Sequence, residues 1–200
     1  EASYGSDSSK MLSASFGLGA EQEHYSGWTY AAKGGITWKP NDRFSFDLDI
    51  NYKDRDGWLL WQGDRNFTTF EGADWQPQLA VDVFLSARHQ FRMTMQWVGL
   101  RMDEQAHYEV PMAGSGQGYL LPVLARDPAL GKDDFAISRI TAQLRYRWEI
   151  APLSDLFLVY TRGSNLAGRV DDEFGDLFQD ALSDPIVDVF VMKLRYRFGN

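Results

Sequence analysis

The feature that most constrains this chain is the strict alternation of apolar and polar residues near its end. Residues 186–198 read IVDVFVMKLRYRF, with an aromatic or aliphatic residue at every second position from Phe190 to Phe198. Lys193, Arg195 and Arg197 stand between the last of these apolar residues. Because side chains alternate across a β-strand with a period of two, the segment is predicted to be a strand with one apolar face and one charged face.

The same alternation recurs upstream and predicts eight strands in all. The clearest example follows residue 44, where Phe44, Phe46, Leu48, Ile50 and Tyr52 alternate with polar residues. The predicted strands cover residues 10–21 and 27–39, the stretch from 44 to a turn at 63–66, its return as far as 85, then 91–110, a segment around 139–149, 155–162 and 186–198. The strand at 155–162 is apolar on both sides, so its faces stay unassigned.

The connections between these strands alternate in length. Those at residues 40–42, 86–90 and 151–154 are short, whereas those at 111–134 and 163–185 are long. Short turns at one end of a sheet and long loops at the other are typical of transmembrane β-barrels. LRYRW at residues 144–148 and LRYRF at 194–198 end two strands that run in the same direction, which places both at one predicted membrane depth.

Composition excludes several classes of protein. The chain has no Cys, which rules out disulfides, thiolate catalysis and Cys-ligated zinc. A net charge of -8 argues against a general nucleic-acid binder, so no nucleic-acid partner is expected. The chain contains no run of eighteen apolar residues, so no transmembrane helix is predicted. Three isolated histidines, at 24, 89 and 107, disfavour a His-based metal site, and no cofactor is predicted.

Two fold classes fit the alternation: a soluble β-sandwich binding module, whose apolar face fills a core, and a membrane barrel, whose apolar face meets lipid. Three features favour the barrel. The polar faces carry charges of both signs. Aromatic residues gather at two levels near the strand ends, as the two interfaces of a bilayer select. Phe44 to Tyr52 spans about nine residues, the length of a tilted membrane-crossing strand. The predicted fold is therefore all-β, an antiparallel up-and-down transmembrane β-barrel.

Two resemblances point the same way. An amphipathic last strand ending in an aromatic residue resembles the C-terminal targeting signal of bacterial outer-membrane β-barrels, which gives Tyr196 and Phe198 the role of a terminal assembly signal. From Phe135 onward, ITAQLRYRWEIAPLSDLFLVYTRGSN and the ending VMKLRYRFGN resemble the C-terminal barrel of an uncharacterised family of bacterial outer-membrane proteins. That family joins a periplasmic carbohydrate-binding-like domain to a barrel, and the resemblance implies an outer-membrane location but no reaction.

The charged residues of the polar faces are the first candidate site. They are predicted to line the barrel interior, either attracting anions as charged rings do or pairing with Asp47, Asp49, Asp82 and Glu149. Pairing is the favoured reading, because a narrow barrel fills its interior with side chains and unpaired buried charge is costly. The predicted lumen-lining charges are Asp47, Asp49, Asp82, Arg92, Arg139, Arg145, Arg147, Lys193, Arg195 and Arg197.

An acidic stretch is a second, weaker candidate. Asp171, Asp172, Glu173 and Asp176 offer oxygen ligands of the kind that Ca²⁺ prefers, but their spacing fits no EF-hand loop, so a solvated surface loop is favoured over a metal site. Residues 172–182 also suit a short helix with Phe174 and Leu177 on one face. Nothing singles out a nucleophile, so no catalysis is expected.

These observations predict a polar tail or turn at residues 1–9 and an outer-membrane barrel domain at 10–200, acting as a membrane anchor or conduit. The alternative functions are a rim-active lipid hydrolase or acyltransferase and the soluble module. Expected partners are outer-membrane lipids, the barrel-assembly machinery, and an upstream periplasmic domain or further strands. The eight strands could close by themselves, with residues 10–21 paired to 186–198, or they could form part of a larger barrel. Self-closure is slightly favoured.

Overall fold

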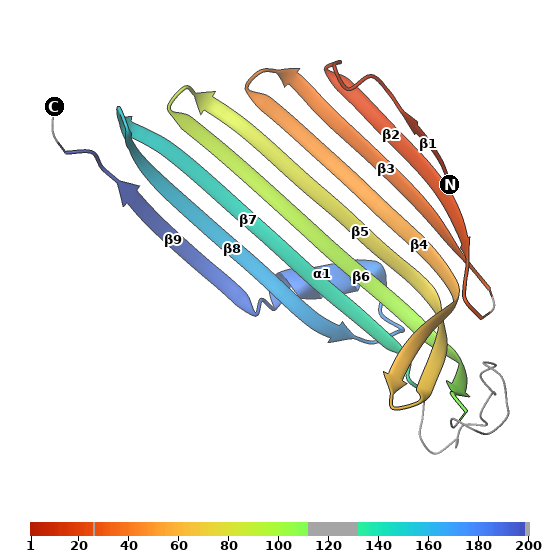
Figure 1. The fold of residues 1–200 in the computed structure, drawn as a ribbon. Helices are drawn as coiled ribbons and strands as arrows, with labels where there is room; N and C mark the ends of the chain where they lie inside the picture. The colour runs from red at the N-terminus through yellow and green to blue at the C-terminus, as the bar shows by residue number, and fades with distance from the viewer. Residues whose placement is uncertain (26, 112–131, 199–200) are drawn as a thin grey trace.

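The structure is a computed structural model that describes residues 1–25, 27–111 and 132–198. Nine strands form one antiparallel sheet in which neighbours in the sheet are also neighbours in the chain. Figure 1 shows them side by side, from β1 at the red edge to β9 at the blue edge. The strands are β1 (Ala2–Gly5), β2 (Leu12–Gln22), β3 (Trp28–Asn41), β4 (Phe44–Gly63), β5 (Asn66–Ser86), β6 (His89–Glu109), β7 (Phe135–Ala151), β8 (Ser154–Gly168) and β9 (Val187–Arg195).

The up-and-down antiparallel order agrees with the prediction, and the turns are short at one end of the sheet. Each of these turns is closed by one residue pair at the strand ends: Asn41 with Phe44, Ser86 with His89, and Ala151 with Ser154. The opposite end carries the β8–β9 connection, which contains the single helix of the described residues, α1 (Phe174–Ser183). Most of the predicted connection 111–134, with its run of glycines at 114–118, lies outside the described residues.

The sheet does not close on itself among the residues that the structure describes. β1 pairs only with β2, and β9 pairs only with β8. The expected pairing of residues 10–21 with 186–198 is therefore not observed. Residues 2–5, expected in a tail or turn, instead form a strand along the edge of β2, with Ala2 opposite Leu18 and Gly5 opposite Ser15.

The last strand is shorter than predicted. β9 ends at Arg195, which pairs with Asp155 at the beginning of β8. Tyr196 to Phe198 run past the end of their neighbour and have no ladder partner, although the Arg197 N–H donates to the Ser154 hydroxyl at 3.0 Å. Alternation in the sequence continues beyond the point where the partner strand stops.

The two faces of the sheet separate apolar from polar side chains. Successive strand registers connect one residue from each of eight strands into rows that run from β2 to β9. One row contains Leu12, Trp38, Phe46, Val81, Met93, Leu144, Tyr160 and Phe190. The adjacent row, on the opposite face, contains Ser13, Thr37, Asp47, Ala80, Thr94, Gln143, Thr161 and Val189. The apolar and polar faces defined by these rows assign β8 as well, placing Leu158 and Tyr160 on the apolar face.

Aromatic residues cluster at two heights on the apolar face. Near the short turns, the rings of Trp38 and Phe44 lie 5.3 Å apart. Nearer the other end, the rings of Tyr52 and Trp75 lie 4.8 Å apart. These contacts join neighbouring strands, and aromatic pairs of this kind stabilise a sheet beyond the area that they bury.

A packed hydrophobic core lies where α1 covers part of the apolar face, over β6, β7 and β8. Leu177 and Ala181 of the helix are fully buried against Trp97, Ala136 and Ile140. Leu177 comes so close to β8 that a Cβ on Gly168 would lie 2.3 Å from its Cδ2 atom. The Trp97 indole N–H donates to the Ser138 hydroxyl, which donates in turn to the Leu177 carbonyl oxygen. The predicted apolar helix face is thus used to dock α1 on the sheet.

Candidate functional site: the polar face of the sheet

The strand registers place nine of the ten predicted interior charges on the polar face. Arg197 is the tenth and lies just beyond the end of β9. The charges are separated by strand: β4 carries Asp47 and Asp49, whereas cations follow one another along β6, β7 and β9. Among the predicted interior charges, those of β4 are acidic (the acidic side), whereas those of β6, β7 and β9 are basic (the basic side).

The basic side has two carboxylates that pair with arginines. Arg92 Nε lies 2.6 Å from Asp82 Oδ1. Asp155 binds two arginines: Arg147 at 2.9 Å through Oδ1, and Arg195 through Oδ2. The side chain of Asp155 is 1% exposed, so these arginines replace the water that its charge would otherwise require.

The remaining cations do not pair as predicted. Within residues 1–25, 27–111 and 132–198, no ion pair joins Arg139, Arg145 or Lys193 to a carboxylate. Asp47 and Asp49 are three strands away from β7, roughly 14 Å at the usual strand spacing, which is too far for a direct contact. The expectation that Asp47, Asp49 and Glu149 neutralise these cations is wrong, and Asp82 pairs with Arg92 rather than with a cation of β7 or β9.

The acidic side is held by small polar neighbours. The Ser45 hydroxyl donates to Asp47 Oδ2 at 2.9 Å. The Asp49 carboxylate and the Ser15 hydroxyl lie directly over Gly35. A Cβ at position 35 would be 2.5 Å from Asp49 Oδ1 and 2.6 Å from Ser15 Oγ. Small residues in β2 and β3 thus leave room for the charged side chains of β4.

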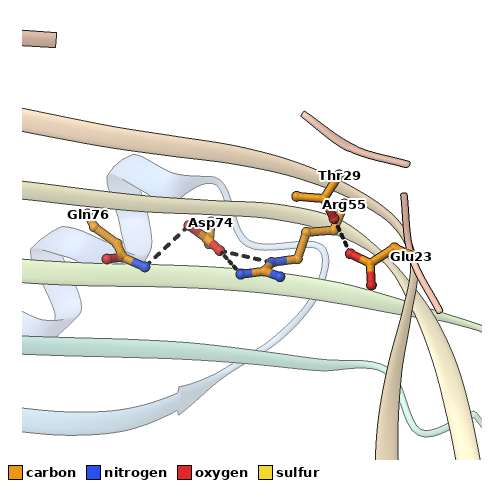
Figure 2. A network of polar contacts seen from close by, with 5 residues as sticks. All are labelled: Glu23, Thr29, Arg55, Asp74 and Gln76. Atoms are coloured by element: carbon orange, nitrogen blue, oxygen red, sulfur yellow. Dashed lines mark hydrogen bonds and ion pairs between the residues drawn. The ribbon is translucent and has the colours of Figure 1, made fainter. Parts of the chain in front are cut away.

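A buried network that the sequence did not reveal lies further along the polar face, towards the long connections. Arg55 on β4 donates to Asp74 Oδ2 through Nε at 3.0 Å and Nη2 at 2.9 Å, and Asp74 is 2% exposed. Figure 2 shows Asp74 between Gln76 and Arg55, with the hydrogen bond from Thr29 to Glu23 beside them. The Arg55 guanidinium also lies 4.5 Å from the centre of the Trp58 ring.

A second cluster missed from the sequence lies near the long-loop end of β6. His107 Nε2 and Glu104 Oε1 are 2.8 Å apart, and a carboxylate oxygen of Asp133 lies within 4.8 Å of both ligand atoms. The other ring nitrogen of His107 lies 2.8 Å from the Thr68 hydroxyl. This hydroxyl–imidazole–carboxylate chain has the order of a catalytic triad, but Thr68 has no exposed surface, so a substrate cannot reach its oxygen.

The acidic stretch considered for a metal has other contacts. Asp172 accepts hydrogen bonds from the backbone N–H and the side chain of Arg169, at 2.8 and 3.4 Å. Glu173 precedes the helix, and Asp176 lies in its first turn. The side chains of Asp171, Asp172, Glu173 and Asp176 form no potential metal-binding group in the described part of the chain.

The predicted assembly signal is accessible. Phe198 is 87% exposed, and its ring lies 4.9 Å from that of Tyr196. Tyr196 is 50% exposed, so both rings are accessible to a recognising protein.

Comparison with known proteins adds no further constraint: no family model, curated protein or solved structure matched the chain. No helix within the described ranges is both long enough and apolar enough to cross a membrane. The functional argument therefore depends on the geometry of the two faces.

Proposed function

We propose that this sheet is part of the wall of a transmembrane β-barrel in a bacterial outer membrane, serving as an anchor or conduit. The apolar face would contact lipid, and the polar face would line a water-filled interior. The short turns would lie on the periplasmic side and the long connections outside, the arrangement usual in such barrels.

The observation that carries this proposal is the large, uncovered apolar face. Side chains such as Leu12, Phe16 and Ile36 lie on this face and are 56%, 54% and 48% exposed. Soluble monomers rarely expose contiguous apolar patches beyond a few hundred Å², whereas this face extends over eight strands. In the described structure only α1 covers part of it. A bilayer supplies the missing apolar contact.

The aromatic contacts support the same orientation. The pairs Trp38–Phe44 and Tyr52–Trp75 lie at the two ends of the apolar band on β4, where membrane interfaces favour amphipathic rings. α1 packs on the apolar face near the second of these levels, with Phe174 6.5 Å from the Trp75 ring and its acidic residues Asp176 and Asp180 exposed.

The open edges require further strands. Unpaired backbone N–H and C=O groups in hydrocarbon cost several kcal/mol each, so β1 and β9 cannot both end in lipid. We propose that additional strands, from the same polypeptide or from another copy, complete a barrel wider than the self-closed eight strands of the sequence prediction. Because Arg139, Arg145 and Lys193 on the polar face are exposed and have no carboxylate partner among the described residues, the interior is proposed to be wet.

The proposal is tested by refolding the protein into vesicles that contain brominated lipids. Trp38 and Trp75 lie on the apolar face, so their fluorescence should fall relative to vesicles without bromine. Trp61, in the β4–β5 hairpin, is 65% exposed and provides a site for an indole outside the membrane. Single-tryptophan variants should show strong quenching for the first two positions and weak quenching for the third. A folded, monodisperse protein in detergent-free buffer would contradict the proposal.

A further inference from the structure

We infer that the basic side of the polar face contains a binding site for small amphiphilic anions, a carboxylate or similar acid group attached to an apolar body. This inference rests on the proposed function in one respect, that the polar face lines a water-filled interior. It adds the class of solute that this interior would hold.

The site is a depression of about 440 Å³ between β6 and β9, within the range of small-molecule pockets. Two rows of the polar face form it, separated by two residues along each strand. The first row places Arg92 directly opposite Arg145, followed by Val159 and Val191. The second row runs from Gln90 through Arg147 and Phe157 to Lys193.

The charge balance of the depression favours an anion. Four cations line it, and two of them have carboxylate partners: Arg92 with Asp82, and Arg147 with Asp155. Neither carboxylate belongs to the lining. Arg145 and Lys193 contribute two further positive charges that no ion pair in the described structure neutralises. Like charges directly opposite on neighbouring strands destabilise a sheet, and an anion bound between Arg92 and Arg145 removes that repulsion.

The apolar part of the depression favours a ligand with an apolar body. Phe157, Val159 and Val191 lie next to one another on the polar face of β8 and β9, and all three line this one depression. Val159 and Val191 are directly opposite each other, and Lys193 is directly opposite Phe157. A ligand that bridges the cations and these side chains would use both, whereas a hydrated inorganic anion would leave the apolar part unfilled.

The test uses 4-fluorophenylacetate, observed by fluorine NMR, with the protein folded in a zwitterionic detergent. The acid should bind saturably, and neutral 4-fluorophenylacetamide should bind about tenfold or more weakly, because a hydrogen bond to a charged group exceeds one between neutral groups by that factor. Inorganic phosphate should compete only weakly. Adding anionic lipid should leave the affinity unchanged, because lipid would contact the opposite face.

Three variants locate the site. Replacing Arg145 and Lys193 together by Gln should weaken acid binding about tenfold or more, and both side chains are exposed enough to be changed without loss of folding. Phe157→Ser should weaken binding of the fluorinated acid but not of phosphate. Arg139→Gln is the matched control, since Arg139 lies on the same face about 20 Å further along β7 and outside the depression.

Equal binding of the acid and the amide would overturn the inference. So would an Arg139→Gln effect as large as that of the double variant, because general attraction by the basic side would then explain binding. An unchanged affinity in Phe157→Ser would refute the amphiphilic class. These failures differ from failure of the proposed function, which would appear as a lack of lipid quenching regardless of any ligand.

Discussion

Leu48→Arg is the substitution for which the structure gives the most definite expectation. Leu48 stands at the middle of the apolar positions of β4, four residues from Phe44 and four from Tyr52. At about 3.4 Å per residue and a tilt of about 40°, it lies roughly 10 Å from either end of the band, close to the centre of a band about 25 Å tall. An arginine on the lipid face near this depth costs about 2–4 kcal/mol, falling to about 0–1 kcal/mol near the interfaces.

The control places the same residue on the other face at nearly the same height. Gln78 pairs with Asp49, next to the pair formed by Leu48 and Leu79, and is exposed on the polar face. Gln78→Arg should change the free energy of unfolding by less than about 1 kcal/mol, as surface substitutions usually do. Both variants are compared by guanidinium unfolding in lipid vesicles. Equal losses, or a larger loss for Gln78→Arg, would refute the assignment of the faces.

Three further substitutions test separate features. Phe198→Ala should reduce the amount of protein that reaches the outer membrane in cells but change refolding into detergent little, since Phe198 is 87% exposed; equal losses in both assays would assign it a packing role. Asp155→Asn, which weakens the partner of Arg147 and Arg195, should lower the denaturation midpoint more than Asp188→Asn, whose single pair with Arg162 is 3.4 Å long; the opposite order would contradict the account of the basic side. Gly72→Ala should destabilise the protein by about 1–3 kcal/mol, because φ is +152° and the new Cβ would lie 2.0 Å from the Arg101 carbonyl oxygen, whereas Gly34→Ala, with nothing within 4 Å, should be nearly neutral in the same unfolding measurement.

The strand order and the division of the faces were predictable because both follow from local patterns. A period of two identifies strands, and alternately short and long connections predict an up-and-down order. Leu48, Val81, Leu144 and Leu194 all lie on the apolar face, as their alternation indicated. The helix was found in the same way, from the spacing of Phe174, Leu177 and Phe178.

Features set by pairing between distant residues could not be predicted. β1 lacks an apolar pattern, and only its register against β2 makes it a strand. Asp155 follows a turn in a segment without clear alternation, so its role as a partner of Arg147 and Arg195 was not visible. Arg55 and Asp74 are nineteen residues apart in sequence, and no short motif connects them. Closure of the sheet is not observed among the described residues, and it depends on the sheet edges rather than on any single strand.

The most direct test of the central claim, that one face of this sheet meets lipid and the other meets water, is a single-cysteine scan of β4. The chain has no native cysteine, so each of residues 45–51 can carry one nitroxide label after refolding into vesicles. The account predicts that Phe46, Leu48 and Ile50 positions are accessible to oxygen, which concentrates in lipid, and that Ser45, Asp47, Asp49 and Asn51 positions are accessible to a water-soluble nickel complex. An accessibility profile without this period of two, or with the two phases exchanged, would contradict it.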